Sequence, residues 1–222
     1  MKPFIWLPKF WRLALGGLLC AVLMLAGCEG SGSGHLGDGH DFGPNNPNLY
    51  IAFGDSITAG SGLASPNDAY PAKLAGMLNK TVLNKGFPGY SSGEGLDIIY
   101  SILDDYKPGY MLILFGVNDI IMGYGEEVAA VNLRIMIQAC KDNKTIPVIA
   151  TLTPVFGEHE AYSSGVNRLN GLIHQLCSEL NTALVDLNGA FDDNPIYIQA
   201  DGLHPNETGQ ALMAITFYDV VK

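Results

Sequence analysis

A serine that directly follows an apolar stretch is the first residue in this sequence whose setting suits chemistry. Residues 49–53 are apolar enough for a short buried strand, and Gly54 interrupts them where a sharp turn needs backbone freedom. Ser56 is therefore predicted just past the carboxyl end of a strand, at the edge of an open α/β sheet where ligands bind. This setting suits a serine nucleophile in acyl transfer. The alternative is that Asp55 and Ser56 only cap a helix.

A serine hydroxyl is a weak nucleophile unless a base within hydrogen-bond reach takes its proton. Of the five histidines in the chain, only His204 falls at the same predicted edge with an acidic residue close by. Asp201, three residues earlier, can accept the second N–H of the ring and stabilise the imidazolium. We therefore predict Ser56 as nucleophile, His204 as base and Asp201 as the orienting acid. The alternative for His204, which precedes Pro205, is a surface residue that caps the last helix.

The tetrahedral intermediate of acyl transfer also needs hydrogen-bond donors for its oxyanion. The candidates are the backbone N–H of Ser56, the backbone N–H of Gly89 in the glycine-rich loop of residues 84–93, and the side-chain amide of Asn118. Gly89 and Asn118 also have structural alternatives, because glycine and asparagine both support turns. The loop is not a typical phosphate loop, since it lacks the lysine of a Walker motif and the Rossmann glycine spacing.

These residues can meet only if the elements that carry them form one parallel sheet. Short apolar runs predict strands at residues 49–53, 81–84, 111–115, 146–152 and 183–187. Apolar residues at helical spacing predict helices between them, namely Val128, Val131, Ile135 and Ala139, then Val166, Leu169, Ile173, Leu176 and Leu180, and finally Ala211, Ile215 and Tyr218. This alternation predicts a single-domain three-layer α/β/α sandwich with a five-stranded parallel sheet.

The residues singled out above fall in four short motifs, which occur in a fixed order. They are Gly-Asp-Ser-Ile at residues 54–57, N-x-G-x-x-G at residues 84–89, G-x-N-D at residues 116–119 and D-x-x-H at residues 201–204. Together they span most of residues 49–205 and resemble the sequence blocks of the SGNH/GDSL hydrolase family. Ile57 replaces the leucine that is usual in the first block.

The resemblance implies a flavodoxin-like sandwich and serine hydrolysis without a metal or another cofactor. It implies a catalytic triad of Ser56, Asp201 and His204, and an oxyanion hole formed by Ser56, Gly89 and Asn118. Both sets agree with the assignment made from the residues alone.

The amino terminus has the pattern of an export signal. Three cationic residues, Lys2, Lys9 and Arg12, precede an apolar run at residues 13–26 that is short for a membrane span. The run closes with Leu-Ala-Gly-Cys at residues 25–28, which resembles the lipobox of bacterial lipoproteins. The alternative is an ordinary secretory signal.

The lipobox resemblance implies that residues 1–27 are removed and that Cys28 carries lipid. Two or more acyl chains are enough to hold a protein stably at a membrane surface. We therefore expect a protein that is lipid-anchored in the bacterial cell envelope, on the periplasmic or outer-membrane face. Glu29 after the cysteine, where an aspartate would favour the inner membrane, favours the outer membrane.

The rest of the chain is predicted to be a short linker and one acidic domain. Residues 28–47 are rich in Gly, Ser, Asn and Pro and form a predicted flexible tether, whose histidines and aspartates we treat as solvated; residues 48–222 form the hydrolase domain. Removing residues 1–27 leaves nine Lys and Arg against 22 Asp and Glu, a net charge of −13. This charge argues against nucleic-acid binding, and no partner protein is indicated. Cys140 and Cys177 lie on apolar helix faces, where free thiols are expected more than a disulfide.

The motifs do not distinguish one ester from another. Phe87 and Tyr90 flank Gly89, and residues 120–124 include two isoleucines, a methionine and a tyrosine, which we expect to line an apolar acyl cleft. With membrane attachment, this favours a lipolytic hydrolase similar to lysophospholipases, thioesterases or arylesterases. The alternatives are an O-acetylesterase acting on envelope polysaccharide or peptidoglycan, and a surface lipoprotein that binds glycans without catalysis.

Overall fold

The fold is built on a parallel sheet of five strands. The computed structural model describes residues 35–222, so the predicted signal peptide and the lipid site at Cys28 lie outside the described residues. The strand order is β2-β1-β3-β4-β5, all parallel. The strands are β1 (Asn46–Gly54), β2 (Thr81–Gly86), β3 (Pro108–Leu114), β4 (Ile146–Ala150) and β5 (Ala183–Val185). All seven residues of β3 are buried, as expected for a central strand covered on both faces.

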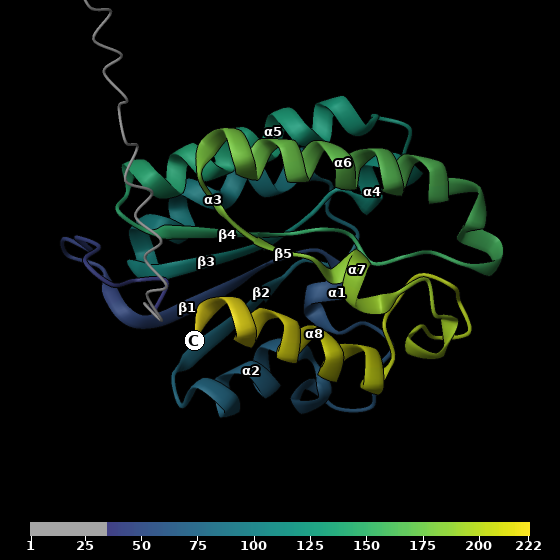
Figure 1. Ribbon diagram of the computed structural model, residues 1–222, viewed down its shortest axis with the longest axis horizontal. Coiled ribbons are helices and arrows are strands. Elements are labelled where there is room, and N and C mark those ends of the chain that lie inside the picture. Colours follow the sequence, from purple (N-terminus) through teal and green to yellow (C-terminus); the bar gives the residue numbers. More distant parts are fainter. Residues whose placement is uncertain (1–34) are drawn as a thin grey trace, which may run out of the picture. The chain divides into compact units, whose positions relative to one another are not determined.

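Helices cover both faces of the sheet (Figure 1), which confirms the predicted three-layer fold. One face carries α3 (Ser92–Tyr106), α5 (Glu126–Asp142) and α6 (Ser163–Leu180), and the other carries α2 (Tyr70–Leu78) and α8 (Glu207–Val221). Among residues 35–222, no helix is long and apolar enough to cross a membrane.

Short helical segments follow the strands. Three are α-helices that come directly after β1, β3 and β5, namely α1 (Ser56–Ala59), α4 (Val117–Ile121) and α7 (Leu187–Phe191). Three are 3₁₀ turns, namely η1 (Pro66–Asp68), η2 (Gly157–Tyr162) and η3 (Pro195–Tyr197). Because all five strands are parallel, α1, α4 and α7 all start at the carboxyl edge of the sheet.

Two strands, β4 and β5, end two residues earlier than the sequence predicted, because side chains replace the strand partners. After β4, Leu152 donates its N–H to Asn170 Oδ1 (2.7 Å) and accepts at its carbonyl from Asn170 Nδ2 (3.1 Å). After β5, Asp186 caps α7 by accepting from the N–H of Gly189, so Leu187 becomes helical. The strand predictions at residues 146–152 and 183–187 were therefore two residues too long.

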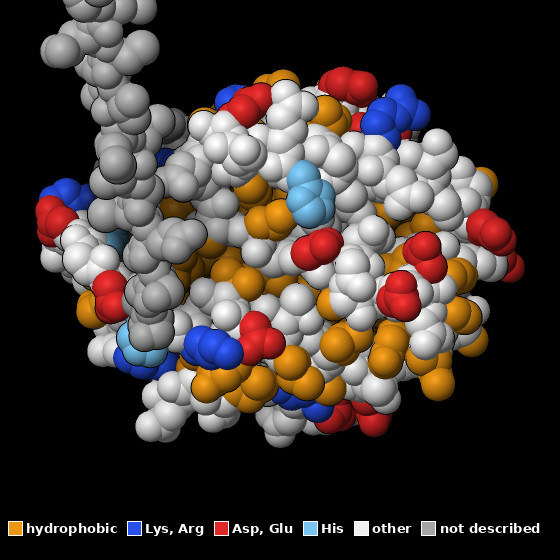
Figure 2. Space-filling model, in the orientation of Figure 1, with side chains coloured by type: hydrophobic (Ala, Val, Ile, Leu, Met, Phe, Trp, Pro, Cys, Tyr) orange, Lys and Arg blue, Asp and Glu red, His pale blue; other side chains and the backbone are white. Residues whose placement is uncertain are grey.

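The helix α5 is present as predicted, but of the four apolar residues that predicted it only Ala139 is buried, and the other three face solvent. Val128, Val131 and Ile135 are 49%, 55% and 39% exposed, whereas Leu133 and Met136 are buried against the sheet layer. α5 has two apolar stripes, and spacing alone does not tell which one packs. In α8, likewise, Ile215 is half exposed, while α6 buries most of its predicted stripe. Figure 2 shows further apolar side chains at the surface between α6 and α8.

Residues 35–47 differ from the flexible tether predicted for residues 28–47, because they pack on the domain. The buried side chain of Asn45 donates to Asn143 O (2.6 Å), and His40 Nε2 lies 3.0 Å from Lys144 O. Lys144 also forms an ion pair with Asp41 at 2.5 Å. The domain therefore starts before residue 48. Residues 28–34 lie outside the described part of the chain. Cys140 and Cys177 are both buried free thiols, as expected.

Truncation of a side chain on the buried stripe of α5 should change the free energy of unfolding much more than truncation on the exposed stripe. Leu133→Ala should lower the free energy of unfolding by about 2–5 kcal/mol, because it leaves a cavity in the core. Val131→Ala, on the exposed stripe, should change it by less than about 0.5 kcal/mol. Urea unfolding followed by circular dichroism measures both. Equal losses would mean that the exposed stripe of α5 is covered in solution.

Candidate active site

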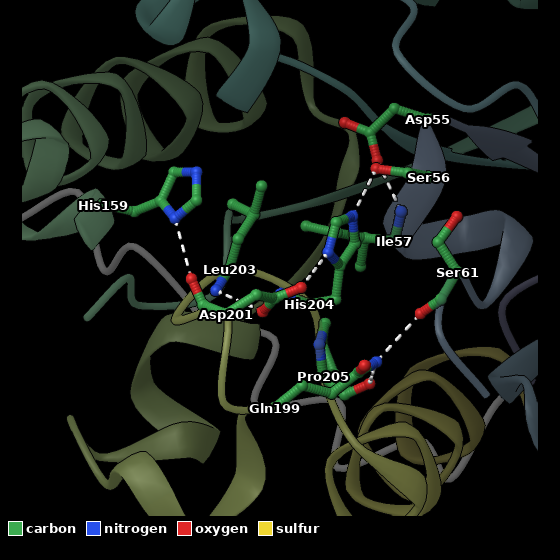
Figure 3. Close-up of polar contacts among 10 residues, drawn as sticks. All are labelled: Asp55, Ser56, Ile57, Ser61, His159, Gln199, Asp201, Leu203, His204 and Pro205. Carbon is green, nitrogen blue, oxygen red and sulfur yellow. Dashed lines mark hydrogen bonds and ion pairs between the residues drawn. The ribbon is translucent and has the colours of Figure 1, made fainter. Parts of the chain in front are cut away.

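The structure brings Ser56, His204 and Asp201 together. Ser56 is the first residue of α1 and is 7% exposed. Its Oγ lies 2.9 Å from His204 Nε2, and His204 Nδ1 lies 2.7 Å from Asp201 Oδ2 (Figure 3). With the ring proton on Nδ1, the imidazole donates to the carboxylate and accepts from the serine hydroxyl. This is the arrangement in which a serine can lose its proton to a histidine.

The position of Ser56 is set by a very close approach of α1 to the sheet. A Cβ on Gly86 of β2 would lie 2.1 Å from the backbone N of Ala59, and one on Gly54 of β1 would lie 2.2 Å from Thr58 Oγ1, both atoms of α1. Asp55 then caps α1 by accepting from the N–H of Ile57 (2.9 Å). Glycines in β1 and β2 therefore let the nucleophile helix lie directly on the carboxyl edge.

The acid is held ionised by several donors. Asp201 accepts from the backbone N–H groups of Leu203 (2.9 Å) and His204 (3.1 Å) as well as from the His204 ring. Burial acts to raise the pKa of Asp201, but the hydrogen bonds from the His204 side chain and the two N–H groups hold that pKa below its usual range. A carboxylate that stays ionised can orient the ring and stabilise an imidazolium.

Two of the three predicted oxyanion donors, Gly89 and Asn118, lie on neighbouring segments, before α3 and at the start of α4. Asn118, in the first turn of α4, is 8% exposed and donates one amide hydrogen to Tyr90 O (2.9 Å), which leaves its second amide hydrogen for a ligand. Gly89 has φ +83°, and Gly116, which caps α4, has φ +130°. Within residues 35–222, the N–H groups of Ser56 and Gly89 donate to no protein acceptor. All three groups therefore have donor capacity to spare.

Asp119 joins these two loops, and the sequence reasoning assigned it no role. Its buried carboxylate accepts from Ser92 N (2.8 Å) and Ser92 Oγ (2.6 Å), and Asn132 Nδ2 donates to the same hydroxyl (2.9 Å). α4, which carries Asn118, is thereby fixed to the start of α3, which follows the Gly89 loop. The only sign of this role in the sequence was that Asp119 is the final residue of the G-x-N-D motif.

The loop that carries Asp201 has a second set of contacts, which the sequence did not predict. His159, in η2, places its Nδ1 at 2.9 Å from the carbonyl oxygen of Asp201, and Phe156 donates its N–H to Gly202 O (2.8 Å). Gly202 has φ +75°, and a Cβ there would lie 2.1 Å from Phe156 O. The segment after β4 thus braces the loop that carries the acid. Nothing in the spacing of these residues indicates the contact.

None of the residues expected to line an apolar acyl cleft is fully buried. Phe87 and Tyr90, on either side of Gly89, stack with ring centroids 5.0 Å apart. Met122 and Tyr124, beyond α4, are 48% and 56% exposed. Within residues 35–222, no group of three His, Cys, Asp or Glu side chains could hold a metal ion.

A serine, a histidine and an aspartate hydrogen-bonded in series at the carboxyl edge of a parallel sheet define a serine hydrolase site. The sequence of residues 52–212 matches the GDSL-like Lipase/Acylhydrolase family, and the chain belongs to this family. The protein is an ester-bond hydrolase.

Named relatives are similar over most of the domain. The thioesterase 1/protease 1/lysophospholipase L1 of Escherichia coli strain K12 is 25% identical over 170 residues, which cover 74% of this chain and 78% of that protein. The arylesterase of Vibrio mimicus is 27% identical over 176 residues, which cover 74% and 83%. A solved structure of a lipolytic G-D-S-L protein from Veillonella parvula has the same fold, with a TM-score of 0.70 and 22% identity over 78% of this chain and 97% of that one.

The buried carboxyl of Asp55, beside the nucleophile, predicts a pH-dependent stability. Burial raises the pKa of Asp55 from 3.8 to about 7, the Ile57 N–H opposes this increase, and the negative charge of Asp119 adds to it. Because the folded-state pKa is higher than the unfolded one, ionisation favours the unfolded chain, and stability falls as the pH rises from 3.8 to about 7.

Asp55→Asn keeps the oxygen that caps α1 but removes this charge. The variant should melt at a higher temperature than the wild type at about pH 8, and the difference should shrink towards about pH 4. Thermal unfolding across that pH range measures the effect. A difference that does not vary with pH would mean that Asp55 stays ionised in the folded protein.

Proposed function

We propose that this ester hydrolase acts on lipid-type acyl esters at a membrane surface, through an acyl-enzyme on Ser56. The observation that carries the catalytic assignment is the hydrogen-bonded series Ser56–His204–Asp201, with distances of 2.9 and 2.7 Å. In the proposed mechanism, Ser56 Oγ attacks the ester carbonyl carbon while its proton passes to His204 Nε2. The Asp201 carboxylate stabilises the imidazolium.

The negative charge that develops on the carbonyl oxygen is received by three donors. They are the N–H of Ser56, the N–H of Gly89 and the free amide hydrogen of Asn118. The intermediate then collapses, the bond to the leaving oxygen breaks, and His204 returns its proton to that oxygen, which releases the alcohol. Water, deprotonated by His204, attacks the acyl-enzyme in the same way and releases the carboxylic acid.

The acyl class is inferred from the surroundings of the site and from the relatives. The Phe87–Tyr90 stack beside the oxyanion glycine offers an apolar surface, and the exposed Met122 and Tyr124 follow the Asn118 motif. Two relatives carry the names thioesterase/lysophospholipase and arylesterase. The lysophospholipase name supports a lipid acyl ester, and the thioesterase and arylesterase names support an acyl group on a thiol or an aromatic alcohol. No basic cluster for nucleic acid is apparent in this acidic chain.

Substrate chain length tests this proposal. The full-length protein in mild detergent is assayed with p-nitrophenyl esters from acetyl to palmitoyl, beside Ser56→Ala and the exposed control Ser101→Ala. We expect kcat/KM to rise with chain length, since each buried methylene contributes about 0.8 kcal/mol. Ser56→Ala should lower kcat by at least about 10³-fold, and Ser101→Ala should not.

The outcomes are distinct. Activity that survives in Ser56→Ala refutes the nucleophile assignment. Serine-dependent activity confined to acetyl esters would contradict the lipid-type acyl class and favour the alternative, an O-acetylesterase.

We also propose that the protein is a lipoprotein of the bacterial cell envelope, attached through Cys28. The supporting pattern is the Leu-Ala-Gly-Cys sequence at residues 25–28 after a basic and apolar segment. Residues 28–34 would then link the lipid to the folded domain. A lipid substrate would lie in the same surface to which the enzyme is attached.

Labelling with palmitate tests the attachment. The wild type expressed in a bacterium that processes lipoproteins should incorporate radiolabelled palmitate and enter the detergent phase on Triton X-114 partition. Cys28→Ala should do neither, because a single residue carries all the acyl chains. Cys20→Ala, inside the signal segment, is the matched control and should label normally. Labelling retained in Cys28→Ala would contradict the proposal.

A further inference from the structure

The proposed proton transfer joins two segments that lie far apart in the sequence. Ser56 and His204 are 148 residues apart, on α1 and on the loop before α8. No strand pairing connects the two segments, because β1 pairs with β2 and β3, while the His204 loop follows β5 at the edge of the sheet. Something other than the strand ladder must therefore set the distance between Oγ and Nε2.

Within the described chain, three pairs of residues are hydrogen-bonded between residues 55–61 and 199–210. One is the Ser56–His204 pair itself. The others are Gln199 with Ser61 and Gln210 with Ile57, each through a glutamine side-chain amide and a backbone carbonyl. Glutamine side chains therefore make the hydrogen-bonded connections that flank the reacting pair.

Gln199 connects the end of the nucleophile segment to the residue after the histidine. Its Nε2 donates to Ser61 O (2.8 Å) and to Pro205 O (3.1 Å), as Figure 3 shows. Its own backbone N–H donates to His204 O (2.8 Å). The loop is packed tightly there, since a Cβ on Gly62 would lie 2.2 Å from Gln199 Oε1. Both amide hydrogens of Gln199 are thus used to hold the two segments.

Gln210 makes the second connection from the core. It lies in the first turns of α8 and is 1% exposed. Its Nε2 donates to the carbonyl of Ile57 (3.0 Å), the residue after the nucleophile, and its Oε1 accepts from Tyr70 N (2.8 Å). Because both ends of the amide are engaged, the side chain has one orientation. α1 is therefore fixed to the helix that follows His204.

We infer that Gln199 and Gln210 are positioning residues that hold Ser56 Oγ and His204 Nε2 at proton-transfer distance. This inference rests on the proposed role of Ser56 and His204. Proton transfer needs heavy atoms about 2.6–3.2 Å apart, and a misplacement of about 1 Å can lower a rate by about 10²-fold. Both glutamines act as donors to carbonyl oxygens, so a methionine, which has similar length but no donor, removes the connection and leaves the volume filled.

The test compares Gln199→Met, Gln210→Met, the double variant and the control Gln175→Met in the full-length protein. Gln175 is exposed on α6, and its amide donates only within its own helix, to Glu179. The readouts are kcat and KM for p-nitrophenyl butyrate, the rate at which a fluorophosphonate labels Ser56, and the melting temperature. All are measured well below the melting temperature of the least stable variant.

Each single variant should lower kcat and the labelling rate by about 10- to 100-fold. The KM should stay within about twofold of the wild-type value, because substrate contacts are untouched. The double variant should be slower than either single variant, and Gln175→Met should match the wild type. A role in stability alone would lower the melting temperature without this split between kcat and KM.

Folded variants with wild-type kcat and labelling rate would overturn the inference, as would a loss confined to KM. If Gln210→Met does not fold, Gln199→Met decides the matter, because Gln199 is only half-buried and lies outside the core. Failure of the proposed function is seen separately, as activity that survives in Ser56→Ala. Loss of activity in Ser56→Ala together with unaffected glutamine variants would refute the positioning role alone.

Discussion

The 2.9 Å contact between Ser56 Oγ and His204 Nε2 imposes a demand on the whole domain, because its two residues are held by different parts of the fold. Ser56 is fixed by β1 and by the close approach of α1 to Gly86, which no residue with a Cβ would allow. His204 is fixed by the hydrogen bond between its ring and Asp201 and by the one that its carbonyl accepts from the N–H of Gln199. The sheet brings the Ser56 and His204 segments to one edge, and the side-chain amides of Gln199 and Gln210 connect them there by hydrogen bonds.

The polar side chains around this contact are buried and hydrogen-bonded. Asp119, Asn118 and Gln210 are each less than about a tenth exposed, and each has a hydrogen-bond partner on a backbone atom of another loop or helix end. Asp55, equally buried, bonds to the N–H of Ile57 in its own segment. A buried polar group without partners would cost more than it contributes. Satisfied in this way, such groups fix loops that have no strand ladder of their own. The site is therefore rigid where the backbone is irregular.

The acidic character of the chain and the geometry of the site fit an uncharged or lipid ester as substrate better than they fit a nucleic acid with its phosphate backbone. Within residues 35–222, the donors assigned to the reacting atoms are amides, a hydroxyl and an imidazole, and none of them is a lysine or arginine. Such a set stabilises charge that develops during the reaction without attracting charge beforehand. The contact of η2 with Asp201, and the hydrogen bonds of Gln210 to α1 and of Gln199 to Ser61 just after α1, keep that set in place.

The sequence by itself determined the strand–helix alternation, the parallel sheet and the identity of the three residues that meet at its edge, because short apolar runs and turn residues are local signals. It did not determine which apolar stripe of α5 packs, since Val131 and Leu133 are equally apolar and only the neighbouring helices decide between them. It overlooked the packing of residues 35–47, where isolated polar side chains find partners near Lys144. The sequence also did not predict the contacts of His159, Gln199 and Gln210. A side-chain amide donates to whatever carbonyl the folded chain brings near it, and tertiary structure alone decides which one that is.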